Sequence, residues 1–170
     1  VIIDEADRLT LLVNDILNLS KLQAQADGLE KTTINLSKLI ETVIDRFSTV
    51  MTEKGYIIQQ HVEKDVYVSV NEQKIEEVVY NLIGNAINYT GEDKVVKVYL
   101  NADEKTATLE ILDSGLGIDG DKIETIWEKY YRYSETHKRT VKGTGLGLSI
   151  VKAILDSHNL EYGVISKENL

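Results

Sequence analysis

Apolar side chains at the start of the chain follow the repeat of a helix that packs in a bundle, and this repeat then stops. Five of them recur at alternating steps of four and three residues: Ile2, Ala6, Leu9, Val13 and Ile16. An isolated helix cannot bury such a stripe, so it requires a partner chain or further residues. Because Gly28 breaks the pattern, we predict a bundle-type helix with its linker over 1–27 and a second domain over 28–170.

Strand and helix signals alternate in the second domain. Strands are expected at 32–36, 56–61, 66–70, 94–100, 106–112 and 161–166. Helices are expected at 37–53, 71–89 with Asn71 as the N-cap, 121–128 and 144–157. This order predicts an α+β fold, a two-layer sandwich in which helices cover one face of a mixed, largely antiparallel sheet.

Composition and charge exclude several classes of function. No apolar stretch approaches the length that spans a membrane, and the acidic first residues are not those of a signal peptide. The absence of cysteine excludes a disulfide framework and thiolate zinc sites. The net charge of −9 argues against a nucleic-acid partner. One segment, 129–142, is nevertheless basic, which indicates either a small anionic ligand or a solvated loop.

Three asparagines share one face of the helix expected at 71–89. Asn81, Asn85 and Asn88 follow Glu77 at steps of four, four and three residues. A plain solvent face would favour better helix formers than asparagine. Short amide carbonyls in a stripe suit the coordination of a hard cation, although an ordinary polar face remains an alternative.

Two glycine-containing motifs follow strands or open a helix. Asp113 ends a predicted strand and precedes Gly115 and Gly117, which suits close approach of the backbone to a ligand and hydrogen bonding of the carboxylate to an amine. Further on, the segment 143–149, GTGLGLS, opens a helix, where exposed N–H groups and the helix dipole favour phosphate. It lacks the lysine of a P-loop and the spacing of a dinucleotide-binding fingerprint. A hairpin turn and a hinge are the structural alternatives.

The order of these motifs is more specific than any one of them. NLIGNAINYT (81–90), DSGLGI (113–118), IWEKYYR (126–132) and GTGLGLSIVK (143–152) resemble the N, G1, F and G2 boxes of the sensor histidine kinases of the GHKL superfamily. The resemblance covers about 32–166 and implies the Bergerat ATP-binding fold. LTLLVNDILNLSKLQ (9–23) resembles the second helix of the family's dimerisation and phosphotransfer domain.

The resemblance implies ATP and Mg²⁺ as cofactors and assigns a role to each matching residue. Asn85 matches the metal ligand, Asn81 supports it, and Arg132 matches the arginine that reaches the terminal phosphate; these three are the predicted catalytic residues. Asp113 matches the aspartate that recognises adenine, and Tyr89 the residue packed beside it. The remaining expected contacts with the nucleotide are Asn88, Gly115, Gly117, Ile118, Tyr131, Gly143, Thr144, Gly145, Leu146, Gly147 and Leu148.

Asn81 also bears on the type of reaction. Hydrolytic relatives place a glutamate at this position to activate water, and an amide cannot accept a proton. The site is therefore expected to suit phosphoryl transfer by positioning and charge neutralisation. The box with the phosphoacceptor histidine is absent, since His61, His137 and His158 all lack its context. We expect the acceptor to lie outside this chain.

The resemblance further implies partners and a location. A response regulator receiver domain and a second copy, joined through the dimerisation helices, are the expected protein partners. The domain is expected to be cytoplasmic, with any membrane anchor upstream. Two alternatives are a serine kinase of the anti-sigma type and a degenerate module used for dimerisation or signalling.

Overall fold

The computed structural model describes residues 29–128 and 145–167, together with six isolated positions near the N-terminus (Thr10, Val13, Asn14, Ile16, Leu17 and Ser20). These six have helical backbone and exposed side chains. The other positions of the predicted bundle-type helix lie outside the described residues. Within the described part of the chain, no helix is both long and apolar enough to cross a membrane.

The described residues include five strands, which form two sheets. β1 (Thr32–Asn35) pairs antiparallel with β3 (Tyr67–Val70). β4 (Val95–Ala102) lies between β2 (Ile57–Val62), to which it is parallel, and β5 (Ala107–Asp113), to which it is antiparallel. The hairpin between β4 and β5 closes through Asp103, whose carboxylate accepts hydrogen bonds from the backbone N–H groups of Lys105 and Thr106.

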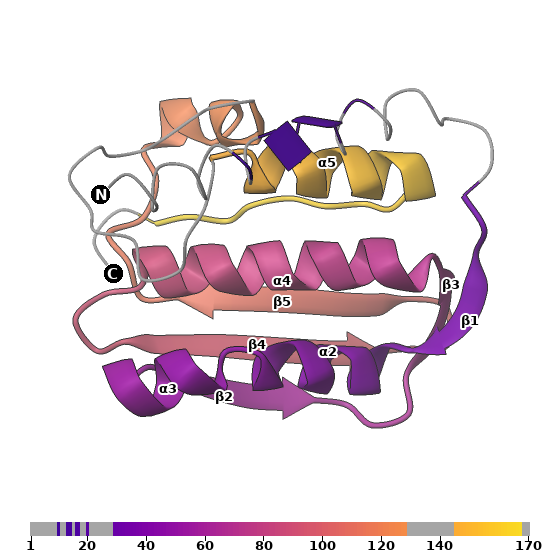
Figure 1. Ribbon diagram of the computed structural model, residues 1–170, viewed down its shortest axis with the longest axis horizontal. Helices are drawn as coiled ribbons and strands as arrows, with labels where there is room; N and C mark the ends of the chain where they lie inside the picture. The colour runs from indigo at the N-terminus through magenta and orange to yellow at the C-terminus, as the bar shows by residue number, and fades with distance from the viewer. Residues whose placement is uncertain are drawn as a thin grey trace.

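Four α-helices are described: α2 (Leu36–Asp45), α3 (Ser48–Lys54), α4 (Glu72–Tyr89) and α5 (Gly147–His158). α2 and α4 lie over one face of the sheet of β2, β4 and β5, and α5 packs beside α4 (Figure 1). α2 and α4 both begin at an asparagine, because Asn35 and Asn71 each accept a hydrogen bond from the backbone N–H three residues later. Isoleucines and valines from α2, α4, α5 and β4 form the core, and Ile40, Val79, Val98 and Ile154 are fully buried. The α+β class is confirmed.

Three predicted elements differ in the structure. The helix expected at 37–53 is two helices, interrupted so that Phe47 lies 2% exposed and stacks on Tyr80 of α4. The helix expected at 121–128 is two single 3-10 turns, η1 (Gly120–Lys122) and η2 (Thr125–Trp127). The segment 161–166 forms no strand, since its backbone pairs with no ladder among the described residues.

Candidate functional site

α4 and α5 lie side by side and run in opposite directions. At one end the backbone N–H of Asn71 donates to Nε2 of His158, at 3.1 Å. At the other end Asn81 meets Gly147, where an added Cβ would lie 2.8 Å from Oδ1. The two contacts are ten residues apart along α4 and eleven residues apart along α5. At about 1.5 Å per residue, these two distances along the helices are similar. The start of α5 therefore faces the C-terminal half of α4 (Figure 1).

Asn81 and Asn85 have different environments on this half of α4. Nδ2 of Asn81 donates to the carbonyl of Glu77 at 2.8 Å, and its Oδ1 lies beside Gly147, so its orientation is fixed. Asn85 lies one turn further, half-buried. Within the described residues no hydrogen bond is made by its amide group. A polar group with this exposure and no protein partner is available to a ligand.

The start of α5 carries no side-chain cap. Gly145 has a φ of 87°, a conformation that favours glycine, and turns the chain into the helix. Leu146 is fully buried and anchors this turn in the core. Gly147 and Leu148 are half-buried in the first turn of α5. The first backbone N–H groups of an α-helix have no partner inside it, so this end has donors and a positive dipole end for an anion.

The loop after β5 is packed against the C-terminal end of α4. An added Cβ at Gly115 would lie 2.2 Å from the carbonyl oxygen of Tyr89, so no larger residue fits there without movement. Ser114 binds the same region, because its hydroxyl lies 3.0 Å from that of Thr90 and accepts from the N–H of Gly91 at 3.2 Å. The end of β5 is thereby fixed beside the end of α4.

Asp113 is the last residue of β5. Its Oδ1 accepts a hydrogen bond from the backbone N–H of Gly115 at 2.8 Å. Although part of the side chain reaches the surface, desolvation raises the pKa of the Asp113 carboxyl, and the Gly115 N–H offsets only part of this. Its other oxygen makes no hydrogen bond within the described residues. A partly desolvated carboxylate of this kind gains from a donor on a ligand.

A contact that the sequence did not predict fixes the far side of this loop. The backbone N–H of Ile118 donates to Oγ of Ser166 at 2.7 Å. Gly117 has a φ of 80°, and an added Cβ there would lie 2.4 Å from the carbonyl oxygen of Lys167. Residues almost fifty positions apart therefore meet. No local pattern could have shown this, since the pairing depends on the path of the chain after α5.

The structure thus brings the described part of the predicted site to the C-terminal half of α4. Asn81 meets the start of α5, and Tyr89 meets Gly115 beside Asp113. Asn85 lies between these two contacts along the helix, and Asn88 is half-buried one turn from it. Four predicted site residues lie outside the described residues: Tyr131, Arg132, Gly143 and Thr144. His137 is also outside them.

Metal coordination by protein groups alone is not found in the part of the chain that the structure describes, where no three carboxylate or histidine groups gather. Asn85 offers one amide oxygen, which is a suitable ligand for Mg²⁺. Mg²⁺ usually takes few protein ligands and completes its shell with water and substrate phosphates. The residues present therefore fit a metal that arrives with a phosphate ligand.

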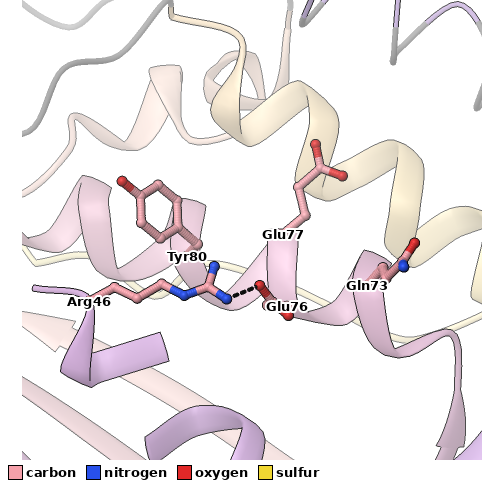
Figure 2. A pocket seen from close by; sticks show the side chains of 5 residues that line it. All are labelled: Arg46, Gln73, Glu76, Glu77 and Tyr80. Atoms are coloured by element: carbon pink, nitrogen blue, oxygen red, sulfur yellow. Dashed lines mark ion pairs between the residues drawn. The ribbon is translucent and has the colours of Figure 1, made fainter. Parts of the chain in front are cut away.

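Two surface hollows lie along the N-terminal half of α4. One, of about 250 Å³, is lined by Arg46, Gln73, Glu76, Glu77 and Tyr80 (Figure 2). Arg46 forms an ion pair with Glu76 across it. The other, of about 360 Å³, lies along β1 and α2. Neither is lined by a predicted site residue, so they are separate from the end of α4 described above.

Comparisons with known proteins identify the family to which the sequence is similar. The model of the family described as histidine kinase-, DNA gyrase B-, and HSP90-like ATPase matches residues 70–169. The sensor histidine kinase WalK of Bacillus subtilis is 31% identical over 91% of this chain and 26% of WalK. WalK of Staphylococcus aureus is 32% identical over 92% of this chain and 26% of that protein. The chain spans about a quarter of the length of these curated relatives.

Solved structures show the same architecture. Full-length ShkA in complex with AMPPNP has a TM-score of 0.81 and 26% identity, over 97% of this chain and 34% of ShkA. The catalytic domain of the histidine kinase ThkA has a TM-score of 0.66 and 27% identity, over 75% of this chain and 81% of ThkA. The chain therefore belongs to the histidine kinase-, DNA gyrase B- and HSP90-like ATPases, and it contains the ATP-binding catalytic domain of a sensor histidine kinase.

Proposed function

We propose that this domain binds Mg-ATP at the C-terminal end of α4 and presents the γ-phosphoryl group to a histidine outside this chain. One observation supports the proposal above the others. The start of α5, which has no side-chain cap, the amide of Asn85 and the carboxylate of Asp113 all lie along the C-terminal half of α4 or at its end. Donors for phosphate, a ligand for a cation and an acceptor for an amine are the groups that an adenine nucleotide with its metal requires.

The phosphate side of the proposed site is formed by α4 and α5. The N–H groups at the start of α5 would bind phosphate oxygens. The amide oxygen of Asn85 would bind Mg²⁺, which supplies charge neutralisation on the triphosphate when bound. Arg132, Gly143 and Thr144 are proposed to complete the phosphate contacts from the segment beyond the described residues.

The base side of the proposed site is formed by the loop after β5. The oxygen of Asp113 that Gly115 leaves unbonded would accept a hydrogen bond from the exocyclic amine of adenine. Gly115 and Gly117 keep this wall thin, and Tyr89 and Ile118 border it. A hydrogen-bond acceptor at this place pairs with the exocyclic amine of adenine but not with the carbonyl of guanine. The site should therefore bind adenine more tightly than guanine.

Asn81 argues for transfer rather than hydrolysis. Its Nδ2 donates to the carbonyl of Glu77, which fixes the amide. An amide is not a general base at neutral pH, so this position cannot take a proton from water. The residues at the end of α4 would position the phosphoryl group and neutralise its charge, which are the main contributions to phosphoryl transfer.

Partners and location follow from the same proposal. A phosphorylated histidine would pass its group to a receiver domain of a response regulator, and a second copy would associate through the bundle-type helices. The domain would work in the cytoplasm, joined to any membrane anchor through upstream sequence. The named relatives are sensor histidine kinases, so they do not favour the serine-kinase or the scaffold alternative.

Titration of the 170-residue chain with ATP, with and without Mg²⁺, tests binding, and GTP tests the base preference. We expect ATP to bind more tightly with Mg²⁺ and more tightly than GTP. Transfer is tested by adding γ-labelled ATP and a separate dimerisation domain that carries an acceptor histidine. Acid-labile label on that histidine would support the proposal. A folded chain that binds no nucleotide would contradict it.

A further inference from the structure

His158 is buried at the end of α5 and uses both ring nitrogens. The side chain is only 3% exposed. Nε2 lies 3.1 Å from the backbone nitrogen of Asn71, and Nδ1 lies 2.8 Å from the carbonyl oxygen of Ile154. A backbone N–H can only donate, so Nε2 must accept. Nδ1 then donates to the carbonyl of Ile154, so both ring nitrogens are hydrogen-bonded within the fold.

Asn71, which donates to His158, also connects the start of α4 to the segment before β1. Oδ1 of Asn71 caps α4 by accepting from the N–H of Lys74 at 3.1 Å. Nδ2 of Asn71 donates to the carbonyl of Glu30 at 3.1 Å. Lys31 then reaches the carbonyl of His158, with 3.2 Å between Nζ and the oxygen. The start of α4, the end of α5 and the segment that precedes β1 are therefore bonded to one another at one point.

This junction lies at the opposite end of the helix pair from the proposed nucleotide site. α4 carries Asn81 and Asn85, and α5 begins at Gly147, beside Asn81. Helices of this length are stiff, so a shift where they are joined at one end changes their relative position at the other. Binding is sensitive to such shifts, since misplacement by about 1 Å can cost two orders of magnitude in an enzyme site.

We propose that His158 is a positioning residue for nucleotide binding. By accepting the hydrogen bond from the N–H of Asn71, it sets the spacing of α4 and α5 at the site, and it connects that spacing to residues 30–31. This inference rests on the function proposed above. It assigns His158 no contact with the nucleotide and no part in phosphoryl transfer.

Two substitutions separate this role from a contribution to stability. Glutamine at 158 is long enough to place an amide oxygen near the position of Nε2, so His158→Gln keeps an acceptor for the N–H of Asn71. Asparagine places its amide near Nδ1 and is too short to reach Asn71. Both are polar and uncharged, and both lose the aromatic ring. Glutamine can therefore keep the hydrogen bond with Asn71, whereas asparagine can keep only the one with Ile154, and the two differ in length by one methylene group.

The experiment measures the Kd of Mg-ATP and the Tm for the 170-residue chain and its variants, at a temperature where each is folded. We expect His158→Asn to raise Kd at least fivefold and His158→Gln to stay within twofold of wild type. Val98→Ala, which removes buried volume from β4, should lower Tm without changing Kd. The amide resonance of Asn71 should shift in His158→Asn and stay near its wild-type position in His158→Gln.

Three results would overturn the inference. His158→Asn could bind Mg-ATP as tightly as wild type. His158→Asn and His158→Gln could lose affinity equally, which would show that the acceptor for Asn71 is not responsible. Val98→Ala could lose as much affinity as His158→Asn, which would assign the effect to general stability. A wild-type chain that binds no nucleotide would instead refute the proposed function, and this inference with it.

Discussion

Gly115→Ala is the most direct test of how the loop after β5 meets α4. The new Cβ would lie 2.2 Å from the carbonyl oxygen of Tyr89, where ordinary van der Waals contact begins at 3.4 Å. The shortfall is about 1.2 Å, and the obstructing atom is a backbone carbonyl oxygen at the last residue of α4, not the end of a flexible side chain. Forcing extra volume into a packed contact costs about 1–3 kcal/mol. We expect the free energy of unfolding to fall by about 2 kcal/mol.

The same substitution should weaken nucleotide binding. The added Cβ would also lie 2.7 Å from Oδ1 of Asp113, so relief of the clash displaces the carboxylate that we assign to adenine. We expect a loss of affinity for Mg-ATP of about tenfold, which corresponds to about 1.4 kcal/mol. Gly120→Ala is the matched control, because an added Cβ at Gly120 has nothing within 4 Å. That variant should stay within about 0.5 kcal/mol of wild type.

Urea denaturation followed by the fluorescence of Trp127, the only tryptophan, gives the stability of each variant. Calorimetric titration gives the affinity. If Gly115→Ala were as stable as Gly120→Ala and bound Mg-ATP equally well, the contact between the loop and the end of α4 would be refuted.

Further predictions concern two aspartates, one asparagine and the histidines. Asp113→Asn should weaken ATP binding by about 1–3 kcal/mol. Desolvation raises the pKa of Asp113, so the protonated carboxyl favours the folded state, and this contribution to the free energy of unfolding is lost as pH rises above 3.8. Denaturation measured across that range should show the loss in wild type and not in Asp113→Asn. Hydrogen bonds from Lys105 and Thr106 lower the pKa of Asp103, so the stabilisation is present above 3.8 and lost at lower pH; Asp103→Asn should reduce stability near neutral pH and leave affinity unchanged. Asn85→Ala should abolish the difference between titrations with and without Mg²⁺, which an unchanged difference would contradict. The chain alone should place no label from γ-labelled ATP on its histidines, as mass spectrometry can check.

Local patterns in the sequence predicted most of the secondary structure. Asn71 begins α4 as expected, and Val95–Ala102 and Ala107–Asp113 form the expected hairpin. The helix expected at 37–53 was wrong in its continuity, because the burial of Phe47 against Tyr80 decides where the chain leaves the helix. Such an interruption depends on a partner far along the chain, which periodicity does not contain.

By itself the sequence determined the α+β class, the family and the kinds of group at the site, because the motifs carry their chemistry in residue type and spacing. The tertiary structure decided which of these groups meet. The contacts of Asn81 with Gly147, of Tyr89 with Gly115 and of Asn71 with His158 each join residues from separate elements. The physical reason is that these contacts arise from the packing of α4 against its neighbours, and packing is a property of the folded chain.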